Sequence, residues 1–138
     1  MQYLPGHDPG VARIIRQEES RIENTLDLIA AENHAPRSIL EDQGSIFSTK
    51  AAEGYPGSRF HAGCICADEL EILAIERAKR LFGADHANLQ PHSGVSANLA
   101  VYFSVLEVGD KLLTMKLSDG GHLSHGDRSS ITSKCFNF

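Results

Sequence analysis

Apolar residues recur at helical spacing in two long stretches of the chain. The first stretch follows Asp8 and Pro9, and its apolar residues stand at positions 11, 14, 15 and 22. Asp8 is suited to the N-cap and Pro9 to the first helical position, so a helix is expected to begin there. The second stretch, residues 68–82, has acidic residues near its start, basic residues near its end and Gly83 after it. This pattern predicts the clearest helix of the chain, with its leucines on a buried side.

Shorter apolar runs surround a third predicted helix in the second half of the chain. Residues 88–90 resemble a short inner strand, residues 94–106 continue as a largely apolar helix, and residues 111–117 resemble a second strand. Strand, helix and strand at this spacing predict a βαβ unit with parallel strands and a right-handed crossover. The sequence therefore predicts an α/β fold.

The segment between the first two helices has weaker patterns. Residues 26–30 are expected to be extended, and a brief helix is expected to start near Pro36 and end at Gly44. Residues 45–59 then form a largely irregular stretch that contains the turn sequence Gly-Tyr-Pro-Gly. Loops of this length inside a compact domain are often functional.

The start of the helix at residue 94 offers chemistry for an anion. Ser93 and Ser96 can cap the helix, and Gly94 lets the backbone turn without a Cβ clash. The free N–H groups and the positive end of the helix dipole there suit a phosphate or a carboxylate. An ordinary strand–turn–helix junction is the alternative, and the spacing alone favours it.

Composition and charge argue against nucleic-acid binding and against a membrane span. The 138 residues suffice for one domain with a core, and the net charge of −5 gives no basic surface for nucleic acid. No apolar run is long enough to span a bilayer, and no signal-peptide core follows Met1. We therefore expect a cytoplasmic protein without a nucleic-acid or membrane partner.

Cysteine and histidine residues do not form a recognisable metal or disulfide pattern. Three cysteines are too few and too unevenly placed for a disulfide framework. His122 and His125 form an H-x-x-H pair, and His61 precedes Cys64 and Cys66, but these spacings match no common structural zinc site. We predict no metal.

Four ordered motifs carry a resemblance to a known family. They are LIAAEN at residues 28–33, AEGYPGSRF at 52–60, QPHSG at 90–94 and DGGHLSHG at 119–126. In order and spacing they resemble the N-terminal part of serine hydroxymethyltransferases, from about Gln17 to the end of the chain. The resemblance implies the N-terminal portion of a fold-type I, pyridoxal-phosphate-dependent transferase. Residues 1–60 would be a helical arm and active-site loop, and residues 61–138 the incomplete beginning of the cofactor-binding large domain.

The same resemblance implies an activity and partners. Enzymes of this family interconvert serine and glycine, with pyridoxal phosphate as cofactor and tetrahydrofolate as the one-carbon acceptor. It also implies a homodimer or higher homo-oligomer with shared active sites, in which the arm packs against a partner subunit.

Two residues near the turn sequence gain a role through the resemblance. Glu53 matches the active-site glutamate that handles a proton during hydroxymethyl transfer, and in the family its loop reaches the neighbouring subunit's site. His61 matches a family tyrosine and is the candidate for substrate binding. Without the resemblance, a lone loop glutamate is usually just solvated.

The cofactor site is implied by residues further along the chain. Ser93, Gly94 and Val95 match the positions that hold the phosphate, where donors at a helix start are needed. His122 matches the histidine that stacks on the cofactor ring, and the preceding glycines allow a close approach.

Several polar residues of the family motifs are replaced in this chain. The replacements are Ala31 for serine, Ala51 and His61 for tyrosines, Val95 for serine, Ser96 for glutamine and Asp119 for histidine. So many changes around one pocket indicate altered chemistry or none. The alternatives are a threonine-aldolase or transaldolase relative, and a non-catalytic truncated homologue that binds a partner subunit.

The family's cofactor-binding lysine is expected beyond the last motif. The chain has five lysines, and none lies in a T-x-H-K sequence like that of the family. From this we expect a fragment that is inactive by itself.

Overall fold

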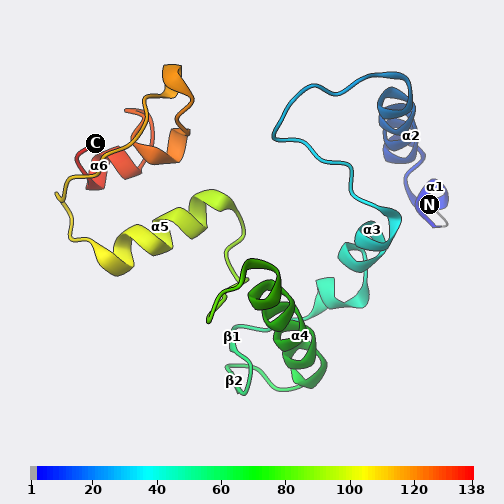
Figure 1. Cartoon of the computed structure of the whole chain (residues 1–138). Helices are drawn as coiled ribbons and strands as arrows, with labels where there is room; N and C mark the ends of the chain where they lie inside the picture. The colour runs from blue at the N-terminus through cyan, green and yellow to red at the C-terminus, as the bar shows by residue number, and fades with distance from the viewer. Residues whose placement is uncertain (1–2) are drawn as a thin grey trace. The chain divides into compact units, whose positions relative to one another are not determined.

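The computed structural model describes residues 3–138, and the chain divides into two compact units, residues 1–50 and 51–138. Figure 1 traces the chain from blue to red through both units. The two units are described separately below.

The first unit consists of helices and connecting turns. Its elements are α1 (Leu4–His7), α2 (Pro9–Asn24), α3 (Arg37–Gln43) and a 3-10 turn, η1 (Ile46–Thr49). Asp8 is the N-cap of α2, and its carboxylate accepts the N–H of Val11 at 2.9 Å. The predicted helix start is confirmed, because the acceptor satisfies an N–H group that has no partner within the helix. Ala12 is buried in this unit.

Residues 26–30 have no regular secondary structure. The carboxylate of Asp27 accepts the N–H of Ile29 at 2.9 Å, and the N–H of Glu32 donates to the carbonyl of Ile29 at 3.0 Å. These local hydrogen bonds turn the backbone, as aspartate side chains often do. The extended piece predicted here thus ends in a turn.

The second unit contains a small hairpin, two long helices and several short helical turns. Its elements are β1 (Gly54–Tyr55), β2 (Ser58–Arg59), α4 (Ile65–Phe82), α5 (Gly94–Val105), η2 (Leu117–Asp119), η3 (Leu123–His125) and α6 (Thr132–Cys135). The helix predicted over 68–82 begins earlier, at Ile65, and ends as predicted before Gly83, which adopts φ 62°. The helix predicted over 94–106 ends at Val105. Figure 1 shows the hairpin beside α4.

The predicted βαβ unit is not formed within residues 3–138. Residues 88–90 are irregular, and residues 111–117 make a single parallel bridge, between Lys111 and Asn137. Strands of a parallel sheet are covered on both faces and paired with neighbours, whereas Leu113 and Met115 are exposed. In the described residues the one sheet is the antiparallel hairpin β1–β2, so the predicted strands are wrong for this structure.

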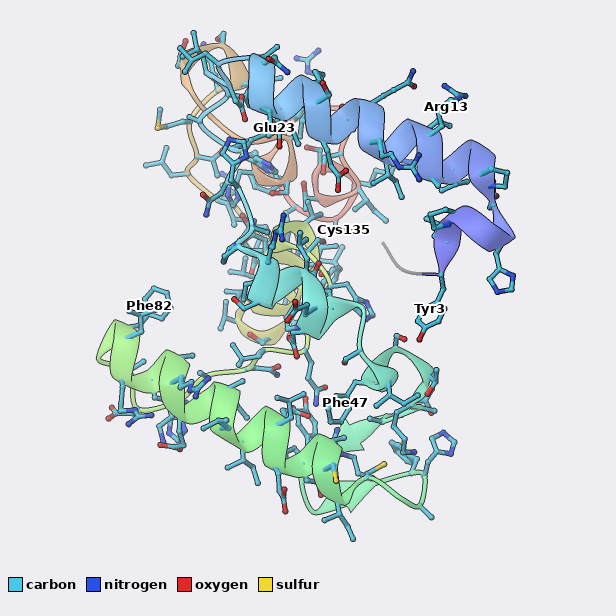
Figure 2. All side chains as sticks on the ribbon, turned by 90° about the vertical axis from the view of Figure 1, so that its right-hand side faces the viewer. Tyr3, Arg13, Glu23, Phe47, Phe82 and Cys135 are labelled. Carbon is cyan, nitrogen blue, oxygen red and sulfur yellow. The ribbon has the colours of Figure 1, made fainter. Side chains whose placement is uncertain are left out.

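The apolar side of α4 is also not buried as predicted. Leu70, Leu73 and Leu81 are exposed, and none of the residues of α4 is fully buried. Phe82, the last residue of α4, extends away from the ribbon in Figure 2. The helical pattern was correct, but the leucine side expected to be buried is exposed in the part of the chain that the structure describes.

The core of the second unit lies between α5 and the end of the chain. Phe136 is 3% exposed, and its ring lies 5.7 Å from that of Tyr102 and 5.2 Å from that of Phe103, between ring centroids. The backbone of Asn137 bonds to that of Asp110 and Leu112 at 2.9 and 2.8 Å. Aromatic burial and backbone pairing together hold the last residues against α5.

We expect the hairpin to depend on glycine at position 54 more than at position 57. Both have positive φ, 99° and 74°, but a Cβ at Gly54 would lie 2.3 Å from the carbonyl oxygen of Ser58, whereas a Cβ at Gly57 meets nothing within 4 Å. Gly57→Ala should cost roughly 1 kcal/mol of unfolding free energy through backbone conformation alone. Gly54→Ala should cost roughly a further 1–3 kcal/mol through the clash. Chemical denaturation of the two variants measures this difference, and equal costs would contradict the hairpin geometry.

Candidate functional site

The hairpin of β1 and β2 carries Glu53 at its base. Gly54 pairs with Arg59 and Tyr55 with Ser58 in the antiparallel register. The N–H of Phe60 donates to the carbonyl of Glu53 at 3.1 Å and extends the pairing by one step. The position of Glu53 therefore follows from the position of the hairpin.

Arg59 holds this hairpin against α4. Its guanidinium donates to Asp68 at 2.7 Å and to Glu71 at 2.6 Å, which lie one turn apart on α4. It also donates to the backbone carbonyls of Ala52 and Gly54 at 2.7 and 2.8 Å. The side chain is 6% exposed. A planar fork of donors is suited to this arrangement, because it satisfies two carboxylates and two carbonyls at once.

Asp68 receives two donors from the hairpin. Its carboxylate accepts the N–H of Gly57 at 3.0 Å as well as the Arg59 guanidinium. The Gly57 N–H and then Arg59 hold the pKa of Asp68 below its usual range, because both favour the ionised form. The two carboxylates in turn raise the pKa of Arg59.

Gln90 extends the same cluster towards α5. Its side-chain amide donates to the carbonyl of Gly54 and to the carboxylate of Glu71, both at 2.8 Å. Gln90 precedes the first turn of α5 by only a few residues. It therefore links the Glu53 hairpin to the segment that leads into that helix.

Glu53 and His61, both predicted site residues, are brought together. The Glu53 carboxylate lies 3.0 Å from Nε2 of His61. The side chains are 74% and 49% exposed, so both are open to solvent and accessible to a ligand.

Ser93 and Ser96 form a capping box at the start of α5, as the sequence suggested. The Ser93 hydroxyl accepts the N–H of Ser96 at 3.2 Å, and the Ser96 hydroxyl accepts the N–H of Ser93 at 2.9 Å. The N–H groups of Gly94 and Val95 lie in the first turn, where a helix provides no internal acceptor. A Cβ at Gly94 would meet nothing within 4 Å. An open helix start with these donors fits a phosphate group.

His122 is connected to α5 through Ser124. Nδ1 of His122 lies 2.8 Å from the hydroxyl and 3.2 Å from the backbone nitrogen of Ser124. The side-chain amide of Asn98 donates to the same hydroxyl at 3.1 Å. Gly94, Asn98 and Tyr102 follow at intervals of four residues, so they share one face of α5.

A pocket lies beside His122 and His125. It is lined by Tyr102, the segment 112–115, the glycines Gly120 and Gly121, and the two histidines. The Tyr102 hydroxyl bonds to Nδ1 of His125. A pocket with apolar walls and imidazole rings provides room for a flat ring next to His122.

Comparisons with known proteins agree with the motifs. The model of the family described as serine hydroxymethyltransferase matches residues 4–138. The chain belongs to the serine hydroxymethyltransferase family. A serine hydroxymethyltransferase of Coprothermobacter proteolyticus is 58% identical over 130 residues, which are 94% of this chain and 31% of the relative. One from Dehalococcoides mccartyi is 51% identical over 137 residues, 99% of this chain and 33% of the relative.

Membership of the serine hydroxymethyltransferase family confirms the resemblance found in the motifs. A further relative of the same name, from Halorubrum lacusprofundi, is 55% identical over 129 residues, 94% of this chain and 31% of the relative. The chain thus spans about a third of the length of the curated relatives it matches.

The site residues expected from the serine hydroxymethyltransferase motifs fall into two groups in the structure. Glu53 and His61 form one group, and Ser93 and His122 belong to α5 and the loop joined to it. Among residues 3–138 no hydrogen bond joins the first group directly to Ser93 or His122. The side-chain amide of Gln90, three residues before Ser93, donates to the carbonyl of Gly54, the residue after Glu53.

Neither a metal-binding cluster nor a membrane-spanning helix is found among the described residues. Across residues 3–138 no group of three or more histidine, cysteine, aspartate or glutamate side chains is arranged to hold a metal ion. Within the same residues no helix has the length and apolar character needed to cross a bilayer.

Sequence reasoning missed the residues that hold the site together. Arg59 was read only as part of a motif, and Asp68 and Glu71 only as favourable charges at the start of a helix. Their spacing by three residues, after an arginine that follows a turn sequence, was the available signal for a two-carboxylate clamp. The contact between Asn98 and Ser124 gave no signal, because it joins residues far apart in the sequence.

We expect the contact between hairpin and α4 to weaken in acid. Because the folded-state pKa of Asp68 is lowered, its contribution to stability is present above the unfolded value of about 3.9 and is lost as pH falls through the lower, folded value. Hydrogen exchange at the Gly57 amide measures this loss. Asp68→Ala removes both acceptor oxygens and should expose that amide at neutral pH as well, and unchanged protection of Gly57 in this variant would contradict the assignment.

Proposed function

We propose that this chain contributes the phosphate-binding helix start, the ring-stacking histidine and the catalytic glutamate of a pyridoxal-phosphate-dependent serine hydroxymethyltransferase. The whole protein would interconvert serine and glycine, with tetrahydrofolate as the one-carbon acceptor. The observation that carries this proposal is the open, capped start of α5, to which the His122 loop is joined through Asn98 and Ser124.

Ser93, Gly94 and Val95 would hold the phosphate of the cofactor. The Ser93 hydroxyl and the two N–H groups are donors at the positive end of a twelve-residue helix. Val95, which replaces a family serine, still provides its backbone N–H. When bound, pyridoxal phosphate would supply an electron sink for charge that develops on the amino acid, while the protein binds and orients the reactants.

His122 would lie against the cofactor ring. Its side chain borders the pocket between Tyr102 and the segment 112–115, and Gly121 precedes it. A Cβ at Gly121 would lie 2.1 Å from the carbonyl oxygen of Met115, so only glycine lets the chain pass so close to that segment. This close approach supports a fixed position for the His122 loop.

Glu53 would hold or move a proton during hydroxymethyl transfer, and His61 would bind the substrate. Their side chains form one hydrogen-bonded pair, and the Arg59 cluster fixes the hairpin below it. In its protonated form the Glu53 carboxyl donates a proton, and in its ionised form it accepts one.

The same proposal covers the oligomeric state and the fold of these residues in the whole protein. A homodimer or higher homo-oligomer with shared active sites would cover the exposed Glu53 loop, and the location would be cytoplasmic. In the whole protein, residues 1–60 would form the arm and loop, and residues 61–138 the start of the large domain. There residues 88–90 and 111–117 would become inner strands, which would bury Leu113 and Met115, now exposed.

A second candidate activity is cleavage of a 3-hydroxy amino acid such as threonine, without folate. The observation that favours it is the loss of polar groups at Ala31, Ala51 and Val95, where the family has serine, tyrosine and serine. Such a cleavage needs the same electron sink and the same orientation of the substrate, so the scaffold would be retained.

Assay of the whole protein tests the proposed activity. Transfer of the labelled hydroxymethyl carbon of serine to tetrahydrofolate is expected, with Glu53→Gln lowering kcat roughly 10²–10⁴-fold because a proton-transfer group is lost. Glu69→Gln, at an exposed carboxylate of α4, is the matched control and should leave kcat unchanged. Threonine cleavage without serine-dependent transfer would favour the second candidate. The absence of both activities would overturn both candidates.

A further inference from the structure

His122 receives two hydrogen bonds at the same ring nitrogen. The backbone N–H of Ser124 lies 3.2 Å from Nδ1, and the Ser124 hydroxyl lies 2.8 Å from it. A backbone N–H can only donate, so Nδ1 must be an acceptor. A neutral imidazole whose Nδ1 accepts carries its proton on Nε2.

Asn98 supports the direction of the hydroxyl bond. Its side-chain N–H donates to the Ser124 oxygen at 3.1 Å, and Ser124 is 2% exposed, so almost no water reaches it. Because Nδ1 of His122 is an acceptor, the hydroxyl directs its proton to it, and the hydroxyl oxygen is left to accept from Asn98. All three donors therefore point the same way, from Asn98 through Ser124 to the imidazole.

The neighbouring histidine lacks this constraint. Nδ1 of His125 bonds to the hydroxyl of Tyr102. A phenolic hydroxyl can donate or accept, so that contact is compatible with either tautomer. The fixed direction at His122 thus comes from the particular partners Asn98 and Ser124.

We propose that Asn98 is a positioning residue that acts through Ser124 to keep His122 as the neutral Nε2–H tautomer with one ring orientation. The importance of this for catalysis rests on the proposed stacking of His122 on the cofactor ring. An uncharged imidazole held in one orientation presents its face to a flat ring, and its Nε2–H remains available as a donor. Asn98 lies one turn from Gly94, so the helix start that would hold the phosphate also sets the distance to His122.

Nitrogen-15 NMR of the histidine side chains tests this proposal in the chain without cofactor. Nitrogen shifts of a neutral imidazole show which ring nitrogen carries the proton, so spectra are recorded roughly two pH units above the ordinary histidine pKa of about 6.5. His122 is expected to show an unprotonated Nδ1 and a protonated Nε2. A proton on Nδ1 of His122 would overturn the proposal without any variant.

Asn98→Asp replaces the donor to the Ser124 hydroxyl by an acceptor, with almost no change in side-chain shape. The new carboxylate takes the Ser124 hydroxyl proton, so Nδ1 of His122 keeps only the backbone donor. The ratio of the two tautomers should shift about tenfold towards Nδ1–H, the effect of about one hydrogen bond. Ser124→Ala should produce a similar shift, and the double variant should add little to either change.

Asn88→Asp is the matched control for the added charge. The Asn88 side chain accepts the N–H of Gln90 at 3.0 Å and is not part of the Asn98–Ser124–His122 hydrogen-bond series, so this variant should leave the His122 spectrum unchanged. An unchanged His122 spectrum in folded Asn98→Asp and Ser124→Ala would overturn the proposal. The NMR experiment contains no cofactor, so an unchanged spectrum would not contradict the proposed activity. Conversely, a whole protein that shows the expected tautomer but no activity would overturn only the proposed activity.

Discussion

The contact between Arg59 and the two carboxylates of α4 is the constraint on which the Glu53 hairpin depends. Two paired residues on each strand are too few for a hairpin to be stable by itself. The guanidinium supplies what the strands lack, because it binds Asp68, Glu71 and two carbonyls of the hairpin backbone. The exposed Glu53 and His61 therefore lie next to a hairpin that is anchored by the nearly buried side chain of Arg59.

Helix α5 plays the corresponding role for the candidate cofactor site. Its first turn presents donors to an anion, its middle anchors His122 through Asn98, and its last turns pack on Phe136. Gln90 joins this helix to the Arg59 cluster through Gly54 and Glu71. A few polar contacts between segments distant in sequence thus place the two groups of site residues.

Local signals in the sequence predicted the local structure well. Asp8 and Pro9 marked a helix start, Gly83 a helix end, and Ser93 with Ser96 a capping box, because each of these depends on neighbours within one turn. The predicted strands and the buried side of α4 were not found, because burial depends on partners that apolar patterns cannot identify. The motifs pointed to candidate site residues, but not to the hydrogen bonds of Arg59, Gln90 and Asn98 around them.

The most direct test of the account is where a cofactor phosphate binds on this chain. Pyridoxine phosphate, which has the ring and phosphate but no aldehyde to react with lysine, can be titrated while backbone amides are followed by nitrogen-15 NMR. We predict the largest shifts at Gly94 and Val95, with a second set at His122. Shifts that are as large at the start of α2, around Val11, as at Gly94 would contradict the account.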